Sequence, residues 1–286
     1  MASGTAKHPR RKIFPRPTDR LALSRTLQVS PFCLGAVTDP RTVSHAFDRG
    51  INFFFLTADM HWPLYEGLRR GLQDLLARSP SVRDQIVVAV VAYVTQPEFC
   101  HMPFVEALQA VPGLGRIDVT VAGGSYKSDF ASRKEQFAMH GPLGARAFGV
   151  SFHDRKMAAK AFKEKLVDIG FVRYNALHLG AEKDCFPHVP RRRKALLYNF
   201  TSTQGFLKPG QHAALGLTPE HWQPEITDYY RFVLGRPEVD GLLCAPRTPE
   251  QVDAMVRAVE QGGLTEEERV YIRDLADLSM GKARLG

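Results

Sequence analysis

The chain has 286 residues, of which 44% are hydrophobic and 24% charged, and such a composition is typical of a globular protein with one barrel-sized domain. No segment approaches the roughly 18 consecutive apolar residues of a membrane helix, and residues 1–18 lack the apolar centre of a secretory signal. We therefore expect a cytoplasmic protein with no membrane partner.

The net charge of +8 is unevenly distributed along the chain. Residues 1–28 contain seven lysine or arginine residues and one aspartate, so they carry +6 of it. This composition predicts a flexible basic N-terminal arm over residues 1–28 and a single domain over residues 29–286. The arm is either simply solvated or a docking site for a protein partner. The sequence predicts no specific binding to nucleic acid, since the basic run at residues 191–194 has no interleaved aromatic residues.

From residue 29 onward, short apolar segments alternate with helical patterns. The apolar segments are typical of strands buried on both faces, and they span residues 29–36, 51–56, 85–91, 117–122, 146–151, 171–174, 195–200 and 241–244. A leucine recurs every four residues from Leu64 to Leu76, which gives the second helix an apolar face. Thr248 and Thr265 are candidate caps of the last two helices. Eight strand–helix units predict an α/β fold, specifically a (β/α)8 TIM barrel.

The segment Gly50-Ile-Asn-Phe-Phe-Phe-Leu-Thr-Ala58 resembles the second barrel strand of aldo-keto reductases. The resemblance implies that an Asp precedes Thr-Ala in that family. It also implies that a Tyr three residues after this Ala protonates the carbonyl substrate, which receives a hydride from NADPH. Here Leu56 stands at the Asp position and His61 at the Tyr position. The family's catalytic Lys and His would fall at Val91 and Gly123. The chain thus resembles, over about residues 29–280, a divergent aldo-keto reductase that lacks the catalytic Asp/Tyr/Lys/His tetrad.

The resemblance also implies where a nicotinamide cofactor would lie. Phe152, Arg173 and Asn199 replace the Asn, the Gln and the aromatic residue that would hold the nicotinamide. Of the expected cofactor site, only the end that would bind the phosphate is retained. It consists of Arg247 and Thr248 at a helix N-terminus, where backbone N–H groups favour an anion. An ordinary helix cap and a surface arginine account for these two residues equally well. We therefore predict no cofactor, with NADPH as the alternative.

Polar residues follow the C-terminal ends of the strands, where TIM barrels place their active sites. His61 is a candidate general acid or base, since an imidazole titrates near neutral pH; Asp59 and Tyr93 are the other catalytic candidates. A histidine simply hydrogen-bonded at the rim is the alternative. Arg173 suits a carboxylate or phosphate group, although a salt bridge to a nearby loop would also explain it. The candidate substrate-binding residues are Trp62, Tyr126, His153, Arg173, Asn175 and Asn199.

Cysteine and histidine residues raise the question of a metal site. His178, Cys185 and His188 are of the types that bind zinc, but their spacing matches no zinc motif and the nearby prolines favour a rigid turn. We predict no metal, with these three residues as the alternative ligand set. The four cysteines lack CxxC spacing and predict reduced, buried thiols.

Three functions remain open from the sequence. The first is a repurposed barrel that performs cofactor-independent acid/base catalysis and tailors a small molecule or peptide in a biosynthetic pathway. The second is a noncatalytic binding or partner subunit. The third is an NADPH-dependent oxidoreductase with displaced catalytic residues, which rests on the fold alone. We favour the first, because the groups needed for carbonyl reduction are replaced together.

Overall fold

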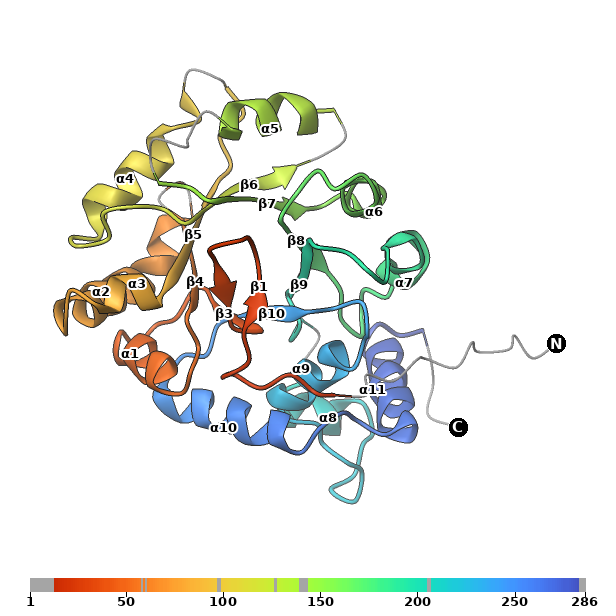
Figure 1. Cartoon of the computed structure of the whole chain (residues 1–286). Coiled ribbons are helices and arrows are strands. Elements are labelled where there is room, and N and C mark those ends of the chain that lie inside the picture. The colour runs from red at the N-terminus through yellow and green to blue at the C-terminus, as the bar shows by residue number, and fades with distance from the viewer. Residues whose placement is uncertain are drawn as a thin grey trace.

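The barrel predicted from the sequence is present. The structure, a computed structural model, describes residues 13–57, 59, 61–96, 99–125, 128–138, 144–204 and 207–282. Within these residues eight parallel strands form a closed barrel in the order β10-β3-β4-β5-β6-β7-β8-β9 (Figure 1). The strands are β3 (Phe32–Leu34), β4 (Phe53–Thr57), β5 (Val87–Ala92), β6 (Val119–Ser125), β7 (Ala147–Phe152), β8 (Ile169–Arg173), β9 (Leu196–Phe200) and β10 (Gly241–Cys244).

Helices follow the strands and surround the barrel (Figure 1). They are α1 (Arg41–Asp48), the 3-10 turn η1 (Trp62–Tyr65), α2 (Glu66–Ala77), α3 (Val82–Gln85), α4 (Met102–Ala110), α5 (Phe130–Ala138), α6 (Arg155–Lys163), α7 (Ala181–Asp184), the 3-10 turn η4 (Phe186–His188), α8 (Pro209–Ala214), α9 (Ile226–Leu234), α10 (Pro249–Glu260) and α11 (Glu266–Ser279). None of the described helices combines the length and the apolarity that spanning a membrane requires. Leu68, Leu72 and Leu76 are buried as predicted, but Leu64 is 64% exposed because it lies in η1, ahead of α2.

Aromatic side chains fill the inside of the barrel. Successive residues of a strand face opposite sides, so Phe53 and Phe55 of β4 point inward while Phe54 packs against the helices. The rings of Phe55 and Phe171 meet edge to face with centroids 4.9 Å apart, and those of Phe53 and Tyr198 are 5.6 Å apart. The interior is therefore a packed core, and space for a ligand exists only at an end of the barrel.

An Asn or Asp side chain precedes every second barrel strand and fastens the N-terminal end of the barrel. Each accepts a hydrogen bond from a backbone N–H at or near the start of the preceding strand. The pairs are Asn52 with Ser30 (2.7 Å), Asp118 with Val88 (2.9 Å), Asp168 with Phe148 (2.8 Å) and Asp240 with Leu197 (2.7 Å). Asn52, part of the motif that resembles the reductases, thus acts in the architecture of the barrel.

Asp118 is the most buried member of this repeat, with no exposed surface. Besides Val88, it accepts bonds from Arg83 at 2.9 Å, Arg116 at 3.3 Å and Arg146 at 2.7 Å. The carboxylate is fully compensated, as a buried charge must be to avoid a large desolvation cost.

Part of the predicted N-terminal arm packs on the barrel. β1 (Leu21–Ala22) pairs antiparallel with β2 (Gln28–Val29), and this hairpin lies over the middle of the strand ring in Figure 1. Leu23 and Leu27 are 4% and 2% exposed and join the apolar filling of the barrel. The predicted boundary at residue 28 is therefore wrong for residues 13–28, because two leucines anchor a segment whose overall composition is basic. Residues 1–12 lie outside the described residues.

Candidate active site

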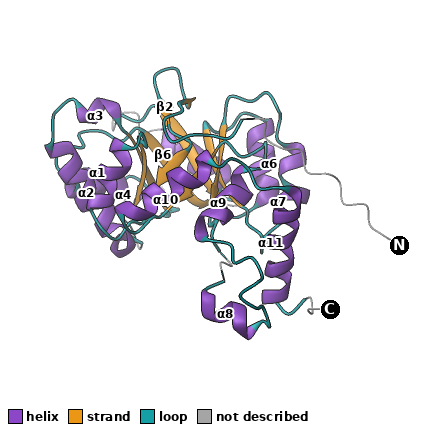
Figure 2. Ribbon diagram, turned by 90° about the horizontal axis from the view of Figure 1, so that it is seen from below, coloured by secondary structure: helices purple, strands orange, loops and turns teal. Residues whose placement is uncertain are grey.

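The C-terminal ends of the strands open into a cavity of about 670 Å³. It lies at the end opposite the hairpin; Figure 2 shows β2 at one end of the barrel and α8, which follows β9, beyond the other. The lining comes from segments that follow six different strands, including His61, Tyr65, Tyr93, His153, Phe200 and Arg247. This is the location at which TIM barrels assemble active sites.

His61, Asp59 and Tyr93 form a contiguous group at one wall. The His61 and Tyr93 rings lie with centroids 4.7 Å apart. The Asp59 side chain is only 9% exposed; it accepts bonds from Thr57 Oγ1 at 2.7 Å and from the Tyr93 backbone N–H at 2.8 Å. Its Oδ1 is 3.6 Å from His61 Nδ1. A carboxylate on this side of the ring favours a proton on Nδ1, which leaves Nε2 as an acceptor.

Tyr93 occupies the space that a side chain at position 123 would need. A Cβ atom built on Gly123 would come within 2.6 Å of the Tyr93 ring, which is too close for any side chain without a shift of the ring. Burial raises the pKa of Tyr93, and the nearby Asp59 charge raises it further, so the phenol is protonated at neutral pH. The Tyr93 ring can therefore take this position only because residue 123 is a glycine.

Tyr65 is a cavity residue that sequence reasoning missed. It ends η1 and lines the same cavity as His61. Burial raises the pKa of its phenol, with smaller contributions from Tyr93, Cys33 and Asp59. The signal was present in the sequence, because Tyr65 is an aromatic residue in the same segment after a strand end as His61. The apolar pattern that starts at Leu64 concealed it.

Arg173 and His153 lie on another part of the rim. His153 lines the cavity, and its ring centroid is 6.1 Å from that of Phe200. The Arg173 guanidinium is 5.6 Å from the centroid of the same Phe200 ring, so Arg173 lies next to a lining residue, although it is not itself among the described residues that line the cavity. Burial lowers the pKa of His153 and of His178, and the positive charge of Arg173 lowers both further. Tyr126, also predicted here, lies outside the described residues.

Comparison with known proteins identifies the fold. No family model matches the sequence, and no curated protein matches it. Among solved structures, a holo-form aldo-keto reductase from Bacillus halodurans is similar with a TM-score of 0.68 at 19% identity, over 94% of this chain and 98% of that chain. The glycerol dehydrogenase of Gluconobacter oxydans has a TM-score of 0.63 at 16% identity, over 94% and 98%. A thermostable aldo-keto reductase in complex with epalrestat has a TM-score of 0.66 at 17% identity, over 90% and 99%.

The chain has the fold of aldo-keto reductases. The resemblance found in the sequence is confirmed at this level. Within that fold, however, Leu56 does not face the cavity: it has no exposed surface and packs between the barrel and the helices. Its neighbour Phe55 lines the cavity instead. The same alternation sends Phe152 outward and leaves Ser151 in the lining, so an alignment of residue types alone misplaces both positions.

Two asparagines predicted to bind substrate serve the aldo-keto reductase fold instead. Asn199 is fully buried, donates to the carbonyl oxygens of Val172 and Tyr174, and accepts a bond from Ser202. Asn175 is also fully buried and donates to the Thr201 carbonyl at 2.8 Å. The amide of Asn199 therefore connects β9 with the C-terminal end of β8, and the amide of Asn175 connects the segments that follow β8 and β9.

Trp62 was also predicted to bind substrate. It is absent from the cavity lining within the described residues and packs on the outer layer of the core. The guanidinium of Arg69 from α2 lies 5.8 Å from its ring centroid. Trp62 thus contacts α2, whereas His61 and Tyr65 line the cavity.

The candidate phosphate site at the start of α10 is occupied by side chains of the chain itself. The Arg247 backbone N–H donates to Gln251 Oε1 at 2.7 Å. The Thr248 side chain caps no backbone N–H, and its hydrogen bond to Glu250 lowers the pKa of that carboxyl. A carboxylate at the helix N-terminus competes with an added phosphate for the same positive end of the dipole.

The candidate metal ligands do not converge. Among the described residues, no group of three or more His, Cys, Asp or Glu side chains is arranged to hold a metal ion. Cys185 is buried, and burial raises its pKa to about 12, whereas His188 is exposed. His178 Nδ1 lies 3.1 Å from Asn175 Oδ1. All four cysteines are free and buried, as the sequence predicted.

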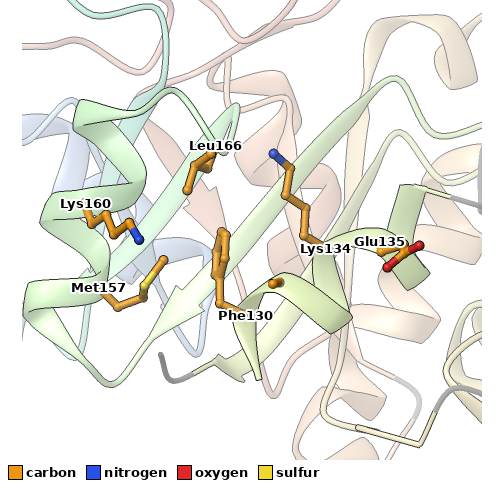
Figure 3. Close-up of a pocket in the computed structure, with 7 residues that line it drawn as sticks. Phe130, Lys134, Glu135, Met157, Lys160 and Leu166 are labelled. Carbon is orange, nitrogen blue, oxygen red and sulfur yellow. The ribbon is translucent and has the colours of Figure 1, made fainter. Parts of the chain in front are cut away.

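A second cavity, of about 500 Å³, lies outside the barrel between α5 and α6 (Figure 3). Phe130, Met157 and Leu166 give it an apolar surface, and Lys134 and Lys160 extend from the two helices at its sides (Figure 3). The described residues that line it include no histidine, cysteine or tyrosine. We call the cavity at the C-terminal end of the barrel the mouth. The second cavity lacks the His61 and Tyr93 side chains that line the mouth, and the mouth remains the candidate active site.

Proposed function

We propose that the protein is a cofactor-independent acid/base enzyme that acts on a small molecule or peptide in a cytoplasmic biosynthetic pathway. His61 is the proposed general base and acid. The observation that carries the proposal is the position of the Asp59 carboxylate beside His61 Nδ1, 3.6 Å away, in the wall of a cavity at the C-terminal end of the barrel. A positioned acid/base group contributes about a hundredfold to ten-thousandfold in rate.

The proposed reaction is a proton transfer within the substrate. His61 Nε2 removes a proton from one atom, and the imidazolium formed, stabilised by Asp59, returns a proton to another atom. No oxidant or reductant is needed for this step. Tyr65 and Tyr93 have raised pKa values, so both phenols remain protonated and can donate hydrogen bonds to an oxygen that gains negative charge in the transition state.

NADPH-dependent oxidoreduction is the second candidate, and the shared fold favours it. The residues fit the cofactor poorly. Asn199 is buried and engaged by backbone carbonyls, Phe152 faces the helices, and Glu250 lies at the N-terminus of α10 near the expected phosphate position. We therefore derive no step through a nicotinamide and expect weak NADPH binding.

Deuterium exchange tests the proposal without knowledge of the product. The protein is incubated in deuterium oxide with fractionated small-molecule and peptide extracts, and mass spectrometry detects deuterium incorporated at carbon. Wild type should label a specific compound, His61→Phe should not, and His188→Phe, which changes an exposed histidine, should label it normally. Labelling by His61→Phe at the wild-type rate would remove His61 from the mechanism.

Two further outcomes separate the alternatives. No labelling by wild type in any fraction would favour a noncatalytic binding or partner subunit. Micromolar NADPH binding by calorimetry, with substrate-dependent oxidation of the nucleotide, would favour the oxidoreductase.

A further inference from the structure

Arg173 ends β8, at the C-terminal end of the barrel, and forms no ion pair with another described residue. Ile169 and Phe171 of β8 belong to the interior of the barrel, so Arg173, two residues further on, faces the same side at the open end. Its Nε is buried, and no hydrogen-bond acceptor for it exists within the described part of the chain. A guanidinium in this condition is ready to bind an anion.

The position of the guanidinium over Phe200 leaves its donors available. Phe200 pairs with Arg173 in the barrel register, and the distance from the guanidinium carbon to the ring centroid is 5.6 Å. An aromatic ring interacts with the positive charge without accepting the in-plane N–H bonds. These N–H groups form a planar fork that matches the two oxygens of a carboxylate.

The acidic residues that follow β8 are engaged elsewhere. Asp184 pairs with Arg155 at 2.8 Å, and Glu182 accepts a bond from Tyr174 at 2.6 Å and pairs with Arg273. These carboxylates are therefore held by other partners and leave the charge of Arg173 uncompensated.

Two histidines flank this charge. His153 lines the cavity and His178 follows β8. The pKa of each is lowered, first by burial and then by Arg173, so both imidazoles are neutral at pH 7. Arg173 is thus the permanent positive charge that acts on both histidines; Arg155 and Lys282 also act on His178, and Arg247 lines the cavity as well. One guanidinium with its planar fork matches a monoanionic carboxylate better than a phosphate dianion.

We propose that Arg173 binds a carboxylate group of the substrate, so that the proposed acid/base enzyme acts on carboxylic acids. This inference rests on the proposed function in one respect: it takes the mouth as the substrate site. His153 and Phe200 line the same cavity as His61, so a molecule held by its carboxylate at Arg173 extends into the cavity that contains the acid/base group.

Probe binding tests the subsite independently of turnover. Benzoate is titrated into the wild-type protein and followed by calorimetry, with benzamide as its neutral isostere. Benzoate should bind at least about tenfold more tightly than benzamide, since a charge-assisted pair is lost in the amide. Arg173→Gln should weaken benzoate binding at least about tenfold, and Arg173→Lys, which keeps the charge but not the fork, should fall between the two.

Matched variants make the outcomes decisive. Arg191→Gln changes an exposed arginine and should bind benzoate as wild type does. His61→Phe should also retain benzoate binding, so failure of the acid/base proposal and failure of the carboxylate subsite give different results. Equal benzoate affinity in wild type and a folded Arg173→Gln protein would overturn the proposal. So would an absence of benzoate binding, or tighter binding of inorganic phosphate than of benzoate.

Discussion

The charged side chains at the two ends of the barrel differ in how completely they are hydrogen-bonded. At the N-terminal end, Asp118 is fully buried and bonded to three arginines and a backbone N–H. At the C-terminal mouth, Arg173 has no acidic partner within the described residues, and His61 Nδ1 is buried just beyond hydrogen-bond distance of Asp59. Asp118 is thus fully hydrogen-bonded at one end, whereas Arg173 Nε and His61 Nδ1 have no hydrogen-bond partner among the described residues at the other.

This difference separates stability from function. An unsatisfied buried polar group costs about 1–3 kcal/mol, and a ligand that completes the interaction would offset that cost. The hairpin covers the other end, called the closed end, where each side chain of the repeat accepts a hydrogen bond from a backbone N–H. The repeat consists of Asn52, Asp118, Asp168 and Asp240. The comparison predicts that changes at the mouth affect activity and changes at the closed end affect folding.

The largest expected effect is on activity at the mouth. His61→Phe should lower the rate about a hundredfold to ten-thousandfold, which corresponds to about 3–5 kcal/mol of the barrier. Its unfolding free energy should change by less than about 1 kcal/mol, since the side chain is 41% exposed. Once the deuterium assay identifies a substrate, rate and urea unfolding are measured on the same preparations. A large loss of stability would show that His61 holds the wall together and does not act in catalysis.

His61→Tyr is the sharper control. It restores the residue that the resemblance expects, while Val91 is buried and Gly123 leaves space only for Tyr93. We expect no carbonyl reduction with NADPH from this variant. Reduction by it would show that the remaining mouth still supports the chemistry of the family.

The second effect is on folding at the closed end. Asp118→Asn leaves Arg83, Arg116 and Arg146 without a shared carboxylate, and breaking a buried ion pair costs about 3–5 kcal/mol. Urea unfolding should show this loss. Asp59→Asn is the matched change at the mouth. It should destabilise the protein less, because Asp59 forms no ion pair with an arginine among the described residues. Equal losses at the two positions would contradict the division between the ends.

The fold could be predicted because its signal is repeated. Eight apolar segments of strand length, separated by helical patterns, leave few alternatives to a barrel, and errors in individual boundaries do not change that result. Asn52 illustrates the limit of such reasoning: its motif pointed correctly to the family fold, but its role in the Asn/Asp repeat depends on strand neighbours that are far apart in sequence.

The site was predicted less well because it depends on which way each side chain faces. Leu56 and Asn199 were one residue away from Phe55 and Phe200, which line the cavity. A strand exchanges its two faces at each residue, so a single-residue error in phase replaces a site residue by a structural one. His61, Asp59 and Tyr93 were found together because they follow strand ends, where alternation no longer applies.

The third effect tests the corrected N-terminal boundary. Deleting residues 1–24 removes β1 and the buried Leu23, and burial of one leucine contributes about 1.5–3 kcal/mol. We expect the melting temperature to fall by several degrees. Deleting residues 1–12 removes only a polar, basic segment and should leave it nearly unchanged. Equal melting temperatures for the two truncated proteins would show that the hairpin adds nothing to the closed end.

The smallest expected effect is on the pKa values of His153 and His178, which report the positive charge of Arg173. Burial lowers the pKa values of His153 and His178 below the ordinary value near 6.5, and Arg173 lowers both further; Arg155 and Lys282 add to the shift of His178. Arg173→Gln removes only the contribution of Arg173, so both histidines should titrate at higher pH than in wild type, which NMR of the ring resonances measures.

Because a histidine with a lowered pKa binds fewer protons folded than unfolded, its contribution to stability is lost as pH falls below about 6.5. Wild type should therefore lose more stability than Arg173→Gln between about pH 7 and 5, whereas Arg191→Gln should follow wild type. Unchanged histidine titrations in Arg173→Gln would mean that its charge does not reach this rim, which would remove the electrostatic basis of the carboxylate subsite.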